Sequence, residues 1–108
     1  MKLRLEDNTL RLRLDPPEVA EFRQHGLLET VVPLGLQATD QLTYTLERTA
    51  DVSALTVQTE VGCIRVLLPA AVADIWTSTA EVSLRGTVAV QHNQVLHILV
   101  EKDLGCKH

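Results

Sequence analysis

Hydrophobic and polar residues alternate along the start of the chain, in two runs at residues 2–5 and 9–14. The apolar positions of both runs are leucines, and strict alternation places them on one face of a sheet. The polar positions that fall on the opposite face are basic, namely Lys2, Arg4, Arg11 and Arg13. Turn-forming residues separate the two runs at positions 6–8. The pattern therefore predicts a β-hairpin with a leucine face and a basic face.

A short helix is predicted directly after this hairpin. Asp15 is a typical N-cap, and Pro16 is typical of the first helical turn. Val19 and Phe22 are spaced to form a buried stripe, and Gly26 is a typical C-terminal stop. The alternation that follows predicts further strands over residues 27–34 and 42–47.

The second half of the chain has the same order of patterns. Strands are predicted over residues 55–59, 63–68, 81–84, 87–91 and 95–101. Pro69 is expected to open a second helix, whose apolar positions are Val72, Ile75 and Trp76. Each half therefore has two strands, a helix and then further strands.

A shift of 54 residues aligns the two halves: Leu10 meets Ile64, and Phe22 meets Trp76. We therefore expect one domain over residues 1–108 that contains an internal duplication of residues 1–54 and 55–108. The alternative is that any two segments with this order of elements align by hydrophobic pattern alone. The predicted fold class is α+β: two ββαββ-like halves that form a strongly curved or barrel-like antiparallel sheet with two short helices.

Composition narrows the choice of function and location. The 108 residues carry a formal net charge of −4, and each half is acidic overall, so no nucleic-acid partner is expected. No apolar run is long enough to cross a bilayer, and the amino terminus carries no apolar signal segment. We therefore expect no membrane association and a cytoplasmic location. The two cysteines are too few for a disulfide scaffold.

The basic row of the first hairpin is one candidate for chemistry. Guanidinium groups bind phosphate and carboxylate through paired hydrogen bonds, so several arginines on one face favour an anion. The alternative is a solvated sheet face whose cations pair with Glu and Thr side chains across the strands. The residues predicted to bind an anion are Arg4, Arg11, Arg13 and Arg65.

A second candidate lies at the carboxyl terminus. The thiolate of Cys106 and the imidazole of His108 are close enough in sequence to bind one transition metal ion, and Asp103 could add an oxygen ligand. Cys63 would complete the site only if the fold brought it near. The alternative is a frayed tail with a structural cysteine. No other cofactor is indicated.

Catalytic motifs are absent from the pattern. No Ser-His-Asp order and no glycine-rich phosphate loop can be read from the sequence. Glu101, which shares a strand face with Asp103, is interpreted as exposed charge, and His97 is interpreted as a structural residue on the outward side of the last strand.

The ends and the middle of the chain resemble a family of small bacterial proteins of unknown function. The segments that carry the resemblance are Met1–Leu5, Asn8–Leu14, Leu42–Leu46 and Leu99–Asp103, followed by Cys106. The resemblance spans nearly the whole chain and implies no established activity. The predicted architecture also resembles the triphosphate-tunnel enzymes. Their first strand carries Glu-x-Glu-x-Lys, whereas this chain has Lys2-Leu-Arg-Leu-Glu6, which argues against their activity.

Three functions follow as hypotheses. The first is a non-catalytic accessory or binding module for an unknown protein partner or small ligand. The second is a transition-metal-binding protein, and the third is a phosphohydrolase whose arginines face into a tunnel. Self-association into a homo-oligomer is compatible with all three, through an outer face on which Leu67 and Leu99 interrupt the polar pattern.

Overall fold

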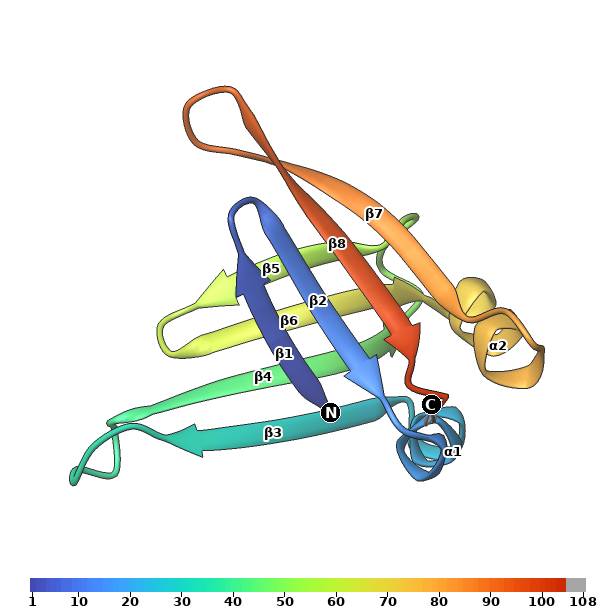
Figure 1. Ribbon diagram of the computed structural model, residues 1–108, viewed down its shortest axis with the longest axis horizontal. Helices are drawn as coiled ribbons and strands as arrows, with labels where there is room; N and C mark the ends of the chain where they lie inside the picture. The colour runs from blue at the N-terminus through green and yellow to red at the C-terminus, as the bar shows by residue number, and fades with distance from the viewer. Residues whose placement is uncertain (105–108) are drawn as a thin grey trace.

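The computed structural model describes residues 1–104, which form two packed sheets and two helices (Figure 1). The first half contains β1 (Lys2–Glu6), β2 (Thr9–Leu14), α1 (Pro16–His25), β3 (Leu27–Pro33) and β4 (Gln41–Thr49). The second half contains β5 (Thr56–Glu60), β6 (Cys63–Pro69), α2 (Ala70–Ser78), β7 (Ser83–Val90) and β8 (Gln94–Lys102). The prediction of an α+β fold with two helices is confirmed.

The predicted barrel is wrong, because the strands form two separate sheets of four strands each. Sheet A has the order β1-β2-β8-β7, and sheet B has the order β3-β4-β6-β5. Each sheet thus combines a hairpin of one half with two strands of the other half. The central pairs, β2 with β8 and β4 with β6, run parallel, so both sheets are mixed rather than antiparallel. Each helix carries the chain from one sheet to the other, and this crossover prevents a single closed sheet.

The two sheets are built at matching registers. Leu10 pairs with Ile98 between β2 and β8, and Tyr44 pairs with Ile64 between β4 and β6. These partners differ by the same shift of 54 residues that aligns the sequence. Every outward position of sheet A therefore has an equivalent position on sheet B. Descent of the two halves from one duplicated unit remains a prediction from the sequence.

The leucine face of the first hairpin lies in the core between the sheets, as the alternation predicts. Leu10, Leu12 and Leu14 are at most 2% exposed. The helices contact each other at one end of the sheets (Figure 1), where the rings of Phe22 and Trp76 meet edge to face with centroids 6.4 Å apart. Both rings are fully buried. This aromatic pair joins the two halves beside the core.

The ends of α1 agree with the sequence. The side chain of Asp15 accepts a hydrogen bond from the backbone N–H of Glu18, and Gly26 adopts the left-handed conformation after the last turn. The buried face of α2 was predicted incorrectly. Ala73 and Trp76 are its buried residues, whereas Ile75 is 57% exposed and Val72 is also exposed. The large indole ring faces Phe22, and this contact sets the rotation of the helix.

The region predicted as two strands over residues 81–84 and 87–91 is the single strand β7. Gly86 stays in the ladder opposite Ile98 and allows the backbone of Leu55 to approach closely. Within residues 1–104, no helix is both long and apolar enough to cross a lipid bilayer.

Candidate anion-binding site

The candidate site lies on the outer face of sheet A, opposite the leucines of the core. Because Leu10 and Leu12 point inward, the residues between and after them on β2 point outward. The register of the hairpin then sets two pairs of like charges directly across the strands. Lys2 lies opposite Arg13, and Arg4 lies opposite Arg11. Such pairs lower stability unless a negative charge compensates them.

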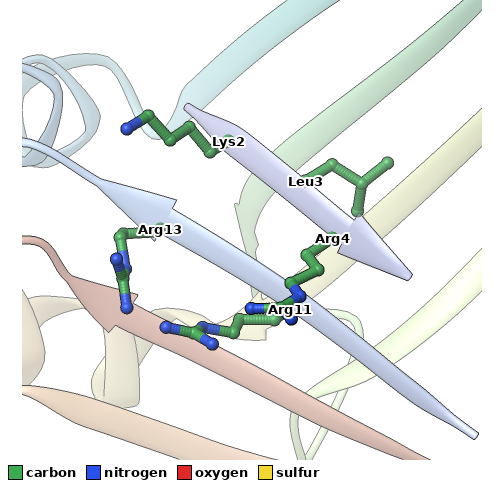
Figure 2. A pocket seen from close by; sticks show the side chains of 5 residues that line it. All are labelled: Lys2, Leu3, Arg4, Arg11 and Arg13. Carbon is green, nitrogen blue, oxygen red and sulfur yellow. The ribbon is translucent and has the colours of Figure 1, made fainter. Parts of the chain in front are cut away.

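These cations border an open hollow of about 430 Å³ (Figure 2). Its lining consists of Lys2, Leu3, Arg4, Arg11 and Arg13. Figure 2 shows that the four basic side chains come from only two strands, with Lys2 and Arg4 on β1 and the other two on β2. Every charged group in the lining is therefore positive.

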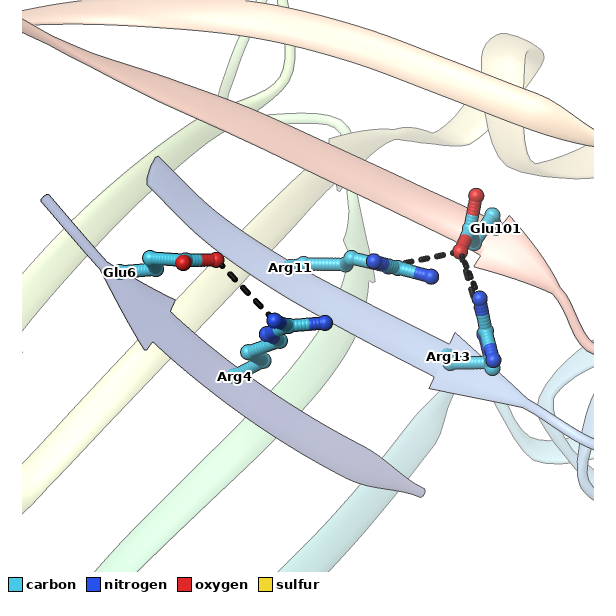
Figure 3. Close-up of polar contacts among 5 residues, drawn as sticks. All are labelled: Arg4, Glu6, Arg11, Arg13 and Glu101. Carbon is cyan, nitrogen blue, oxygen red and sulfur yellow. Dashed lines mark hydrogen bonds and ion pairs between the residues drawn. The ribbon is translucent and has the colours of Figure 1, made fainter. Parts of the chain in front are cut away.

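One carboxylate from β8 holds two of the guanidinium groups (Figure 3). Oε1 of Glu101 accepts hydrogen bonds from Nε of Arg11 at 2.7 Å and from Nε and Nη2 of Arg13 at 3.1 and 2.9 Å. The side chain of Glu101 is 15% exposed. It therefore fixes both arginines on the sheet, as expected for a charge-assisted contact that is partly shielded from water.

The remaining donors of these cations are available to a ligand. Within residues 1–104, both Nη atoms of Arg11, Nη1 of Arg13 and the ammonium of Lys2 make no hydrogen bond or ion pair. Arg4 contacts Glu6 at 3.2 Å, but both side chains are more than 60% exposed, so this ion pair is weak. Four cations and two carboxylates leave a net charge of +2 on this part of the face.

Arg65 does not belong to this site. It lies on β6 in sheet B, at the position equivalent to Arg11, and forms a two-pronged ion pair with Glu47, both hydrogen bonds being 2.9 Å long. Its remaining terminal nitrogen Nη1 donates to Gln58 at 3.3 Å. The hydrogen bonds from Arg65 lower the pKa of Glu47, and the carboxylate in turn raises the pKa of Arg65.

The equivalent positions of sheet B do not repeat the like-charge pairs. Thr56 stands where sheet A has Lys2, Gln58 where it has Arg4, and Leu67 where it has Arg13. The scaffold thus folds with neutral residues at these positions, and the accumulation of cations is specific to sheet A.

The phosphohydrolase hypothesis required the arginines to face into a tunnel. Arg4, Arg11 and Arg13 instead lie on the outer face of sheet A, and Arg65 lies on the outer face of sheet B. Leucine and other apolar side chains fill the space between the sheets. The tunnel is therefore wrong, because the same alternation that buries the leucines turns every arginine of these strands outward.

The predicted metal site falls mostly outside the described residues. Cys106 and His108 belong to residues 105–108, so their placement is not described. Asp103 follows β8, and its backbone N–H donates to the carbonyl of Leu14. Cys63 lies at the start of β6 in sheet B. Among residues 1–104, no group of three or more His, Cys, Asp or Glu residues is placed to hold a metal ion.

The outward pattern also places residues that the sequence did not bring to the site. Glu101, predicted to be exposed charge, is the shared partner of Arg11 and Arg13. Arg85 lies on β7 in the same outward row, and its guanidinium makes no hydrogen bond or ion pair within residues 1–104. Both residues are in phase with the outward positions of their strands. Their proximity to the first hairpin depends on the pairing of β2 with β8, which local alternation does not reveal.

Leu67, predicted to interrupt the outer polar pattern, is only 3% exposed, so it offers little surface for self-association. Leu99 is partly exposed on sheet A. A homo-oligomer remains a prediction.

Comparison with known proteins adds a family but no activity. A family model described as a family of unknown function (DUF7009) matches residues 1–108. Neither the curated proteins nor the solved structures include a match to this chain. The match confirms the resemblance to a family without an assigned function. The chain therefore belongs to DUF7009, a family of unknown function.

Proposed function

We propose that this protein is a non-catalytic binding module that holds an anionic ligand on the outer face of sheet A. The observation that carries the proposal is the pair of like-charged contacts across β1 and β2. Lys2 opposes Arg13 and Arg4 opposes Arg11 without full compensation, although neutral residues occupy the equivalent positions of sheet B. An anion at the centre of these four cations would relieve their repulsion.

The free donors favour a ligand with several oxygens. Arg11 and Arg13 are oriented by Glu101 through their Nε atoms, which leaves terminal nitrogens for a phosphate or carboxylate. Each hydrogen bond between charged groups contributes about 1.5–3 kcal/mol when it forms in a shielded site, and less at an open one. Two or three such bonds suffice for binding at micromolar to millimolar concentration.

The lining of the hollow supports binding rather than chemistry. Lysine and arginine are protonated at neutral pH, and Leu3 has no reactive group. A general base or a nucleophile is therefore missing from the side chains that surround the hollow. The closest carboxylate to Arg11 and Arg13, Glu101, is already occupied by these two guanidinium groups.

Isothermal titration with pyrophosphate and citrate tests the proposal. The Lys2→Thr/Arg4→Gln double variant copies the residues that sheet B has at these positions, so the fold is retained. We expect wild type to bind at least one of the two anions, and the double variant to bind it at least tenfold more weakly. The affinity should also fall as NaCl is raised, because exposed charges are screened.

Arg65→Gln is the matched control, because it removes one arginine from the equivalent strand of sheet B. Its affinity should stay within twofold of wild type, whereas Arg4→Gln alone should weaken binding severalfold. Equal affinities in wild type, Arg4→Gln and the double variant would contradict the proposal, and so would a loss of binding in Arg65→Gln as large as that in Arg4→Gln.

A further inference from the structure

The basic row continues across the whole of sheet A. Arg4, Arg11, Leu99 and Arg85 lie side by side on β1, β2, β8 and β7, each paired in register with the next. Neighbouring strands are about 4.8 Å apart, so the row spans about 14 Å from Arg4 to Arg85. A partly exposed leucine thus separates one cationic end, made by two arginines, from the other end, made by one.

A second hollow of about 590 Å³ adjoins the first on this face. Its lining includes Thr9, Arg85, Thr87, His97 and Leu99. The guanidinium of Arg85 and the imidazole of His97 make no side-chain hydrogen bond or ion pair within residues 1–104. Arg11 on β2 is the neighbour of Leu99 on β8, so the two hollows meet along the row.

We propose that the ligand of this face is an extended acidic segment of a partner protein, which lies across the strands with two carboxylates flanking an apolar side chain. The proposal rests on the proposed function, because one carboxylate occupies the hollow formed by Lys2, Arg4, Arg11 and Arg13. The apolar residue lies on Leu99, and the second carboxylate binds Arg85.

The spacing of an extended chain fits this row. Side chains at positions i, i+2 and i+4 point the same way, and the first and last are about 13–14 Å apart. Carboxylates at i and i+4 would therefore reach the arginines at the two ends, and the residue at i+2 would lie over the leucine. A small anion can occupy one end only.

Charge also distinguishes this face from its counterpart. In sheet B, Glu29 stands at the position of Arg85 and Thr45 at the position of Leu99. The same scaffold thus carries three cations and a leucine in this row of sheet A, but one arginine and one glutamate in sheet B. An acidic segment would select sheet A.

A nucleic acid is the other polyanion to consider. Single strands are usually bound by aromatic side chains that stack on bases, in addition to cations. The outward positions of the four strands in sheet A carry no aromatic residue, because the aromatic residues of the chain are Phe22, Tyr44 and Trp76, and all three are buried elsewhere. The face therefore favours carboxylates with an apolar residue between them.

Fluorescence anisotropy with labelled peptides tests the proposal. The first peptide, flanked by Gly-Ser segments, contains Asp-Ser-Leu-Ser-Asp, and the second contains the same residues with the two aspartates adjacent. We expect the first peptide to bind at least fivefold more tightly. Arg85→Gln and Leu99→Thr should each weaken it severalfold and remove the preference for spacing, while pyrophosphate affinity stays within twofold of wild type.

The outcomes separate this inference from the proposed function. If pyrophosphate binds but the peptides bind equally, or if Arg85→Gln and Leu99→Thr leave peptide affinity unchanged, the acidic segment is wrong and the binding module stands. If neither anion nor peptide binds, both proposals fail. Tighter binding of a single-stranded oligonucleotide than of the first peptide, at equal charge and salt, would also overturn the assignment to an acidic protein segment.

Discussion

Removing two cations from the binding face should stabilise the protein when no ligand is present. The change is Lys2→Thr with Arg4→Gln, which abolishes the contacts of like charge with Arg13 and Arg11. Both new residues already occupy the equivalent positions of sheet B, so the strand geometry accommodates them. A binding site that holds uncompensated charge lowers stability, and the variant should recover that loss.

The magnitude follows from the pairs that disappear. Like charges directly across an antiparallel pair lower stability by roughly 0.2–1 kcal/mol, so the two pairs together account for about 1.2 kcal/mol. The ion pair between Arg4 and Glu6 is lost as well, but both side chains are more than 60% exposed, and its contribution is about 0.3 kcal/mol. The free energy of unfolding should therefore rise by about 1 kcal/mol, which raises Tm by about 4 °C for a domain of this size.

Urea unfolding, followed by circular dichroism at low salt and at 1 M NaCl, measures the effect and identifies its cause. Threonine also favours strands more than lysine does, and that contribution does not depend on salt. Repulsion between exposed charges is strongly screened at 1 M NaCl, where the Debye length is about 3 Å. At least half of the gain seen at low salt should therefore disappear at high salt.

Two results would refute this reasoning. If the double variant is no more stable than wild type at low salt, the four cations do not repel one another enough to matter. If its gain is the same at both salt concentrations, the gain comes from strand propensity, and the contacts of like charge no longer support a binding site.

Three further predictions concern the scaffold. Gly86→Ala should lower the free energy of unfolding by about 1–3 kcal/mol in urea titrations, because a Cβ there would lie 2.8 Å from the carbonyl oxygen of Leu55. Arg65 lowers the pKa of Glu47, so the stability advantage of wild type over Glu47→Gln should be complete above the unfolded pKa near 4.5 and disappear as pH falls through the lower folded pKa; an advantage that persists at pH 2 would contradict this. Trp76→Phe should cost about 2–4 kcal/mol, measured by far-ultraviolet circular dichroism, because a buried indole N–H hydrogen bond and a cation–π contact are lost with part of the core volume; a cost below about 1 kcal/mol would contradict the packing of the two helices.

The two ion pairs at equivalent positions illustrate how the same scaffold supports different surfaces. In sheet B, one arginine and one glutamate satisfy each other, and the surrounding positions are neutral. In sheet A, Arg11 shares Glu101 with a second arginine and faces a third across the hairpin. The excess charge of sheet A is therefore added to a pattern that is complete without it, which is the reason to assign binding to this sheet.

Local chemistry in the sequence determined the elements and the composition of the candidate site. Alternation predicted the hairpins, and the cap at Asp15 and the stop at Gly26 predicted the limits of α1. The same alternation placed Lys2, Arg4, Arg11 and Arg13 on one face, because each side chain of a strand points opposite to its neighbour. These features depend on residues that are close in the chain.

Tertiary structure decided how distant strands pair, and with that the partners of the site. The parallel pairing of β2 with β8 brought Glu101 to Arg11, extended the basic row to Arg85, and left Arg65 on the other sheet. The contact of Trp76 with the first helix likewise set which side of α2 is buried. Alternation fixes which face a residue occupies but not which strand lies beside it, because the choice of neighbour depends on the helical crossovers and on packing between the two sheets.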